Sequence, residues 1–548
     1  MKRKINLICL YLFICLFSVF GCFKQPYSAS FKETRSSKIT DPLPATREVP
    51  SQFRLKQMIR LRTDLKRLHS FSAALAEMAN EMDQLRKRSK IWKKDYFPPE
   101  EHDKIENMVF RYRLIRQSLW EMIDYYIDYR DHFSDSELQT KGFLIGFSAG
   151  LHLTTYSSLV VATFLKEPMG KSKINEAYHP TGIPEGTYDL LYSQVTSIEN
   201  LETIKTAWFL FSNEWKDPDS ILHGISRSDR QYRELIEEIH TLHDQTEKQI
   251  QFILKEDALL FPKTTNRLRQ TMIIKLANLA KGTLDDNLYA IRGLLFSNIS
   301  NLKSPLTRPL TFSPEQKNHI KSLLEPGDII LTYTAGYMSN IFLPGKFKHG
   351  IIYIGTQGQR NALGITKDNL ADIPRVSRKT FLSNLSKETL DSGSPADVIE
   401  AVSEGVIFNS LDYLMESHIN RMVALRPRLT NKERITALVT VFSLLGSDYD
   451  FKFDFNNGTF QCCTEVIYRA LNSKGICDFS LVKRMGSFTL SADDIIRHQL
   501  ALDPAPFDFV LYTEKDPAAS GHKALILTAE EGLTKFRRLM ASQPPTTQ

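Results

Sequence analysis

Cysteine is scarce in this chain, which has six cysteines among 548 residues. They are Cys9, Cys15, Cys22, Cys462, Cys463 and Cys477. The first two lie in an apolar N-terminal run, and the rest are too few to staple a chain of this length, which excludes a disulfide scaffold. No CxxC or HxxxH spacing accompanies them, so we expect no metal site and no cofactor. One cysteine of the adjacent pair Cys462–Cys463 is therefore expected to have a chemical role.

A strong charge of either sign is also missing. The formal net charge is +7, from 70 Lys and Arg against 63 Asp and Glu. This excess is too small for a nucleic-acid-binding surface, but it suits a protein beside anionic lipid or cell-wall polymer. The densest basic cluster runs from Arg86 to Lys94. It is either a solvated helix face or a membrane-surface contact.

The N-terminus carries an export signal. Residues 2–4 are basic, and Ile5 to Phe20 is an apolar run too short for a comfortable membrane span. The run ends in Gly21-Cys22, which resembles the lipobox of bacterial lipoproteins, with Cys22 as the lipidated residue. We therefore predict a lipoprotein-type signal peptide over 1–22. The alternatives are an ordinary signal peptide or an uncleaved anchor. In each case we expect export, and with lipidation a membrane-anchored protein of the cell envelope, on the periplasmic face.

Residues 23–52 are polar and contain four prolines with several Ser and Thr. The segment lacks the apolar content needed to fold, so we predict a disordered tether.

Residues 53–305 show helical periodicity. Apolar residues recur at steps of three and four from Leu55 to Leu85, which predicts one long amphipathic helix broken at Pro98-Pro99. The same pattern predicts helices over about 101–129, 219–255 and 267–298. Such stripes are satisfied by packing against each other, so we expect a helical bundle of four to seven elements.

One segment, 142–165, has no Lys, Arg, Asp or Glu, and Gly142, Gly146 and Gly150 recur at every fourth position. This spacing permits close helix contact in a soluble or a membrane setting. A second membrane span would return the C-terminal half to the cytoplasm, so a buried central helix of the bundle is favoured.

The composition changes after about residue 305. Strands are predicted near 329–332, 349–355, 397–401, 422–425 and 507–512, with helices near 431–445 and 463–473. This pattern is typical of a small α+β domain with a mostly antiparallel sheet, over 320–514. We expect 515–548 to be a C-terminal tail.

Two stretches of this domain carry chemistry. His349 lies at the start of one predicted strand, and Cys463 lies at the start of a predicted helix. Unpaired N–H groups and the macrodipole at a helix N-terminus stabilise a thiolate, and a nearby imidazole completes a nucleophile.

Five segments between about 323 and 513 follow one another in an order that can be compared with known families. They are Pro326-Gly327-Asp328-Ile329-Ile330, Gly345 to His349 running into Ile352 to Gly355, Val398 to Ala401 with Gly405-Val406, Tyr449-Asp450-Phe451, and Cys463-Thr464-Glu465. The set resembles the circularly permuted branch of the NlpC/papain-like cysteine peptidases, the YiiX/YebB-like permuted amidases, to which lecithin retinol acyltransferase is related. The resemblance implies a permuted papain-like domain following the helical bundle.

The resemblance also implies roles. Cys463 would be the nucleophile, with Cys462 as the adjacent alternative, and His349 the general base and then acid. Glu400 would orient the imidazole, as an Asp or Asn does elsewhere. The backbone N–H of Cys463 and the hydroxyl of Tyr449 are candidates for stabilising the oxyanion.

Other polar residues of the domain have simpler explanations. Glu465 in the first helical turn is explained by the helix dipole. Cys477, His418 and His498 have no supporting context.

Three functions remain open. The first is an exported thiol hydrolase that cleaves an amide bond in peptidoglycan peptides. The second is a thioesterase, lipase or acyltransferase acting on membrane lipid, and the third is a non-catalytic envelope scaffold. We expect no nucleic-acid partner, and the sequence does not determine the oligomeric state.

Overall fold

The computed structural model describes residues 50–88, 96–178, 181, 183–260, 309–333, 345–365, 375–456, 458–472 and 477–541. The expected signal peptide, the expected lipobox with Cys22, most of the expected tether and the helix expected over 267–298 lie outside these residues. The expected domain boundaries remain predictions. Where the bounds of a helix or strand differ from them, the difference is given below.

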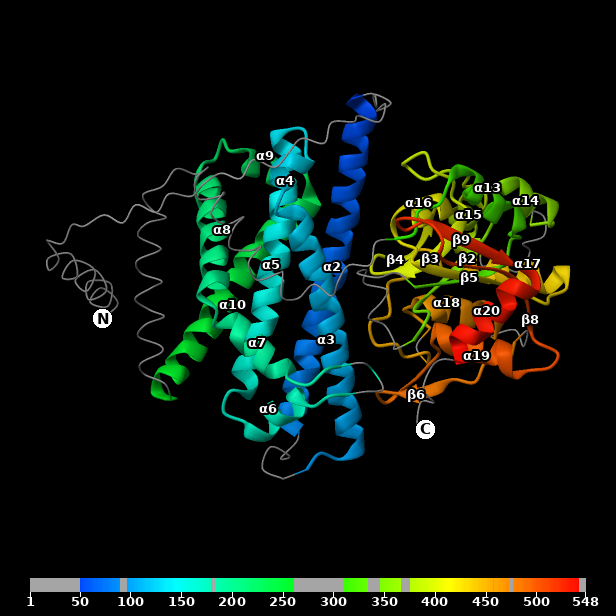
Figure 1. The fold of residues 1–548 in the computed structure, drawn as a ribbon. Helices are drawn as coiled ribbons and strands as arrows, with labels where there is room; N and C mark the ends of the chain where they lie inside the picture. The colour runs from blue at the N-terminus through cyan, green and yellow to red at the C-terminus, as the bar shows by residue number, and fades with distance from the viewer. Residues whose placement is uncertain are drawn as a thin grey trace, which may run out of the picture. The chain divides into compact units, whose positions relative to one another are not determined.

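The N-terminal part is helical (Figure 1). Its helices are α2 (Pro50–Arg88), α3 (Pro99–Tyr126), α4 (Tyr129–His132), α5 (Ser136–Phe164), α6 (Pro168–Asn175), α7 (Thr187–Val195), α8 (Ile198–Lys216), α9 (Ile221–Ser228) and α10 (Arg230–Leu260). Helix α2 therefore begins three residues inside the segment predicted as tether.

The apolar stripe of α2 forms the bundle core as its spacing predicts. Leu61, Leu65, Leu68, Phe71 and Leu75 are all buried. Pro98 is the N-cap residue of α3 and Pro99 its first residue, a position where a missing N–H leaves no hydrogen bond unmade. The proline pair thus starts a helix.

Helix α5 packs against α2, α3, α7 and α10. The side chain of Asp135 caps it by accepting a hydrogen bond of 3.0 Å from the N–H of Leu138. Gly146 permits a close approach to α3, because a Cβ there would lie 2.7 Å from Cβ of Tyr126. Among the described residues, α5 is the helix that length and composition would allow to span a membrane, and 72% of its most apolar window is buried in the protein.

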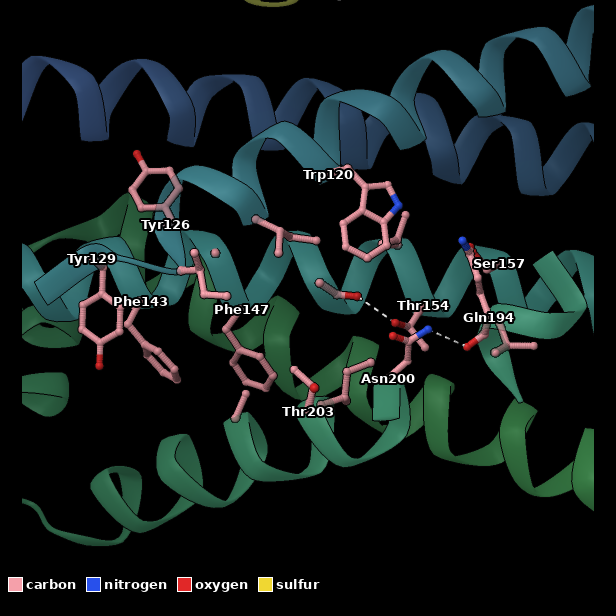
Figure 2. A pocket seen from close by; sticks show the side chains of 18 residues that line it. Trp120, Tyr126, Tyr129, Phe143, Phe147, Thr154, Ser157, Gln194, Asn200 and Thr203 are labelled. Carbon is pink, nitrogen blue, oxygen red and sulfur yellow. Dashed lines mark hydrogen bonds between the residues drawn. The ribbon is translucent and has the colours of Figure 1, made fainter. Parts of the chain in front are cut away.

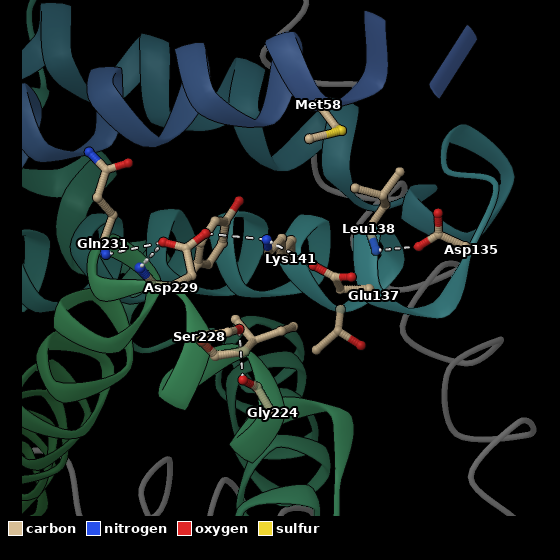
Figure 3. A network of polar contacts seen from close by, with 12 residues as sticks. Met58, Asp135, Glu137, Leu138, Lys141, Gly224, Ser228, Asp229 and Gln231 are labelled. Atoms are coloured by element: carbon tan, nitrogen blue, oxygen red, sulfur yellow. Dashed lines mark hydrogen bonds and ion pairs between the residues drawn. The ribbon is translucent and has the colours of Figure 1, made fainter. Parts of the chain in front are cut away.

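The helix predicted over 219–255 is in fact two helices, α9 and α10, separated at Asp229. Oδ1 of Asp229 accepts a hydrogen bond of 3.2 Å from the N–H of Gln231 and so caps α10, while Oδ2 lies 3.2 Å from Nζ of Lys141 on α5 (Figure 3). Glu137 is a second partner of Lys141, at 3.0 Å. At the break, the carboxylate of Asp229 thus caps the start of α10 and anchors this helix to α5.

The C-terminal part is built on a seven-stranded sheet in which every described pair is antiparallel, in the order β4-β3-β2-β1-β5-β8-β9. Its strands are β1 (Ile329–Tyr333), β2 (His349–Tyr353), β3 (Val398–Val402), β4 (Gly405–Asn409), β5 (Arg421–Pro427), β8 (Phe507–Lys515) and β9 (Ala524–Thr528). Strands β6 (Val482–Arg484) and β7 (Ser487–Thr489) form a separate hairpin.

The helices of this part precede, connect and follow the strands. They are α13 (Pro314–Leu323), α14 (Gln357–Ala362), α15 (Arg375–Leu385), α16 (Leu411–Ser417), α17 (Asn431–Ser443), α18 (Cys463–Leu471), α19 (Ala492–Ala501) and α20 (Ala529–Ala541). Helix α18 packs on β2 and β3.

The prediction of a C-terminal tail from 515 is wrong. Strand β9 pairs with β8, and α20 covers both strands with Phe536, which has no exposed surface. The sequence pattern did not predict the edge strand β9, because this strand is short and a helix begins directly after it.

The Pro326-Gly327-Asp328 segment fixes the start of β1. Gly327 has φ of +99°, a left-handed conformation that favours glycine. Oδ2 of Asp328 accepts a hydrogen bond of 2.8 Å from the N–H of Glu325, and Arg426 of β5 holds both oxygens of this buried carboxylate. The turn therefore locks the entry to the central strand.

Candidate active site

His349 is the first residue of β2 and is almost fully buried. The segment before it is held by Asp493 of α19, whose two oxygens accept hydrogen bonds of 2.9 Å from the N–H groups of Lys346 and Phe347. Asp493 has no exposed surface. A carboxylate from a distant helix thus sets the path of the chain into His349.

The imidazole of His349 faces Glu400 of β3. Nε2 of His349 lies 2.7 Å from Oε2 of Glu400, and the Asn409 side-chain amide donates a 2.5 Å hydrogen bond to Oε1. Glu400 is 3% exposed. Burial alone would raise its pKa, but the hydrogen bond and charge of His349 and the Asn409 hydrogen bond lower the pKa below its usual range. Glu400 is therefore an ionised partner of the ring.

Cys463 is the first residue of α18 and is 4% exposed. Nδ1 of His349 is buried and forms no hydrogen bond in the described part of the chain, while the charge of Cys463 acts on the ring. Burial disfavours the thiolate, yet the charge of His349 and the N–H groups of Gly350 and Thr464 together lower the pKa of Cys463. Burial likewise disfavours the imidazolium, but Cys463 and Glu400 outweigh it and raise the pKa of His349 to about 10.

The pKa of the adjacent cysteine, Cys462, is shifted in the opposite direction. Burial, and then the charges of Cys463 and Glu465, raise the pKa of Cys462 well above its usual value. Its N–H donates a 3.3 Å hydrogen bond to Oε2 of Glu465, so the residue serves as the N-cap of α18. Of the two cysteines, the environment favours the thiolate only at Cys463.

Tyr449 lies next to both cysteines. Burial, followed by the charges of Cys463 and Cys462, raises the pKa of this phenol well above its usual value. Its ring contacts Phe451 and Phe453, and its backbone bridges to Gln461, two residues before Cys463. The hydroxyl is therefore protonated and able to donate.

Residues that the sequence pattern did not assign also contribute. Asn409 holds Glu400 from the adjacent strand β4, nine residues away, and Asp493 holds the segment before His349 from about 146 residues away. Neither contact is marked by a sequence motif. His418 stands within electrostatic reach of Glu400, and burial lowers its pKa to about 4, so its imidazole is neutral. Glu465 caps α18, as its place in the first turn suggests.

Two other candidates lie outside this group. Cys477 is buried, which raises the pKa of its thiol to about 11. His498 belongs to α19 and packs against Phe479. Neither interacts with the Cys463–His349 pair.

Comparison of the chain with curated proteins and with solved structures finds no match. A family model does match, and it covers the stretch that carries the cysteine, the histidine and the glutamate. The match supports a cysteine peptidase- or amidase-like hydrolase. Residues 323–507 of this chain match the family described as permuted papain-like amidase enzyme, YaeF/YiiX, C92 family.

Proposed function

We propose that this chain is an exported, lipid-anchored thiol hydrolase that cleaves an amide bond in cell-wall peptides. The observation that carries the proposal is the buried hydrogen bond between His349 and Glu400, together with the lowered pKa of the buried Cys463 thiol, to which the charge of His349 contributes. The charges of these residues favour a thiolate beside an imidazolium, which is the state that attacks a carbonyl.

In the first half-reaction the sulfur of Cys463 attacks the scissile carbonyl carbon. A C–S bond forms, and the carbonyl oxygen takes the negative charge. When this intermediate collapses the C–N bond breaks, and His349 gives its proton to the leaving nitrogen. The product is an amine and an acyl group held on Cys463.

In the second half-reaction water replaces the sulfur. Acylation removes the thiolate charge, and that charge is a main reason for the raised pKa of His349. The neutral ring can then take a proton from water, the hydroxide attacks the thioester carbonyl, and the C–S bond breaks. Glu400 holds the ring in place throughout, because it binds the nitrogen that faces away from the sulfur.

Two donors suit the developing oxyanion. The backbone N–H of Cys463 is in the first turn of α18, where such groups have no helical partner. The Tyr449 hydroxyl keeps its proton beside the thiolate. We assign both to oxyanion stabilisation.

The substrate class follows from the sequence. The Gly21-Cys22 lipobox and the polar segment after it would hold the enzyme at the envelope, where peptidoglycan stem peptides supply amide bonds. The same anchor would hold it beside lipid, so an acyl ester or thioester of a membrane lipid is the competing substrate.

The test incubates the full chain with peptidoglycan fragments and, in parallel, with phospholipids, and detects released products by mass spectrometry. Cys463→Ala is expected to abolish turnover, while Cys462→Ala, the matched control in the neighbouring position, should keep most of it. Release of lipid acyl groups alone would replace the amide assignment by the lipid one. Equal activity of the Cys463→Ala variant and the parent chain would overturn the mechanism for either substrate.

A non-catalytic scaffold predicts a different result. Such a protein has no need for an activated thiol, so iodoacetamide would label Cys463 no faster than a free cysteine peptide. Rapid labelling of Cys463 at neutral pH, with Cys462 unlabelled, argues against it.

A further inference from the structure

A cavity of about 140 Å³ lies within the helical bundle, between α3, α5, α7 and α8 (Figure 2). Aromatic side chains, Tyr126, Tyr129, Phe143 and Phe147, gather at one end of it. Polar side chains gather at the other end, among them Thr154, Gln194 and Asn200. The cavity therefore has an apolar end and a polar end, as a site for an amphiphile would.

The absence of a side chain at Gly150 of α5 leaves part of this cavity open. A Cβ at Gly142 would lie 2.8 Å from the ring of Phe133, and one at Gly146 would lie 2.7 Å from Tyr126, so those two glycines permit helix contact. A Cβ at Gly150 would meet nothing within 4 Å. The third glycine of the series is thus not needed for packing, and it borders the cavity instead.

The polar end contains hydrogen-bond donors that lack acceptors. Trp120 lines the cavity, and its indole N–H is buried with no hydrogen-bond partner in the described part of the chain. Behind it lies Arg116, whose guanidinium is 5.7 Å from the centre of the Trp120 ring and donates a hydrogen bond to Oε1 of Gln194. An unmade hydrogen bond of a buried donor is costly, so a missing acceptor is expected here.

Arg116 also lacks a counter-charge. It is 6% exposed, its Nε has no partner, and no Asp or Glu of the described residues forms an ion pair with it. A buried guanidinium without an anion is unfavourable. Because Arg116 occupies the oxygen of Gln194, the amide NH₂ of Gln194 is left to donate to a ligand.

We propose that the helical bundle binds a medium-chain carboxylate, with its hydrocarbon tail among the aromatic side chains and its carboxylate at the Trp120–Gln194 end. The Trp120 indole and the Gln194 amide donate to the carboxylate, and Arg116 balances its charge through Gln194. An apolar cavity of about 150 Å³ is known to accept benzene, so a tail of roughly six to eight carbons fits the space. The site is separate from the thiol chemistry and stands without it.

The experiment uses fluorescence quenching by a brominated chain, because bromine quenches a tryptophan that it touches. The full chain is reconstituted in phosphatidylcholine nanodiscs and titrated with 2-bromooctanoate, whose bromine is next to the carboxylate and therefore at the Trp120 end of the cavity. We expect saturable quenching that unlabelled octanoate reverses. The neutral analogue 2-bromooctan-1-ol should bind roughly tenfold more weakly or worse, since it lacks the charge-assisted hydrogen bonds.

Three variants identify the site. Gly150→Leu fills the cavity and should abolish saturable quenching, whereas Gly224→Leu, at an exposed helical glycine that also has open space, should not. Trp120→Phe should remove the quenched signal. Arg116→Met should lose the preference for the acid over the alcohol, and circular dichroism checks that each variant is folded.

The following results would overturn the proposal: no saturable quenching of the parent chain, unchanged binding by the folded Gly150→Leu variant, a quenched signal that survives Trp120→Phe, or equal affinity of the parent chain for the acid and the alcohol. Quenching that octanoate fails to reverse would equally reject a defined site.

Discussion

Nε2 of His349 lies 2.7 Å from Oε2 of Glu400, and both side chains are almost wholly buried. The other oxygen of the same carboxylate is held by Asn409 at 2.5 Å. Since the Asn409 oxygen already accepts from the N–H of Ser410, its amide can only donate to Glu400. Both oxygens of the Glu400 carboxylate therefore accept a hydrogen bond, one from His349 and one from Asn409.

Glu400→Gln places an amide NH₂ against either His349 or Asn409, and both of these are donors. We expect kcat to fall roughly 10²- to 10⁴-fold with the fold retained, because the ring loses its orientation and its counter-charge. Asn409→Ala should cost less, since only one of the two contacts is removed. Steady-state kinetics on a peptide substrate measure both, and an Asn409→Ala loss larger than the Glu400→Gln loss would contradict this order.

The pH dependence follows from the two shifted groups. The pKa of Cys463 is lowered, so the thiolate forms below the ordinary value of about 8.5. The pKa of His349 is raised to about 10, so the ring keeps its proton through neutral pH and loses it as the pH rises through that value. We expect kcat/KM to rise as Cys463 ionises, stay level, and fall near pH 10.

Alkylation gives an independent readout of the same pair. Iodoacetamide labelling needs the thiolate but no acid, so its rate should not fall near pH 10 as kcat/KM does. His349→Ala should move the labelling midpoint upward, toward that of an ordinary thiol. A midpoint already at the ordinary value in the parent chain would mean that the imidazole does not activate Cys463.

Gly350 sets the distance between β2 and α18. A Cβ at this position would lie 2.6 Å from Cδ1 of Ile467 and 3.6 Å from the carbonyl oxygen of Cys463. Gly350→Ala is therefore expected to push α18 away from His349, at a cost of about 1–3 kcal/mol in the free energy of unfolding and most of the activity. Ile467→Val removes Cδ1, so the double variant should recover activity, and no recovery would place the defect elsewhere.

Asp493 holds the chain that enters His349. Asp493→Asn turns one acceptor into a donor that faces a backbone N–H, so we expect a loss of about 1–3 kcal/mol in urea unfolding together with reduced kcat. The matched control is Asp508→Asn, because Asp508 pairs with Arg428 at an exposed site. Its effect on stability should be close to zero, and equal losses in the two variants would argue against a special role for Asp493.

The C-terminal helix is part of the fold. Phe536 has no exposed surface, and its ring lies 6.0 Å from the rings of Phe347 and Phe509. Phe536→Ala should lower the free energy of unfolding by about 3–5 kcal/mol. Phe488→Ala, at a side chain that is 45% exposed, should change the free energy of unfolding only slightly. Thermal unfolding of both variants measures the difference. If the Phe536→Ala variant were as stable as the parent chain, residues 516–541 would not contribute to the stability of the fold.

Local patterns were sufficient for most elements. Steps of three and four predicted α2 and α3, and short β-branched runs predicted β1, β2, β3, β5 and β8, because periodicity reports which face of an element is buried. The order of the motifs led to the Cys463 and His349 segments and to the family. Elements without a clear period were missed, such as β4 and β9, and the break at Asp229 was missed because a capping side chain interrupts a stripe that continues beyond it.

The sequence by itself determined the helical first half and the residue types of a thiol site, since each of these is carried by neighbouring residues, and the export signal stays a prediction from the same kind of local pattern. Only the tertiary structure decided which of two adjacent cysteines has the environment of a thiolate, which residue holds Glu400, and that Gly150 borders a cavity while Gly146 permits helix contact. The physical reason is the same in each case: burial, charge and close contact depend on where the fold places each group, which residue types and their spacing along the chain do not specify.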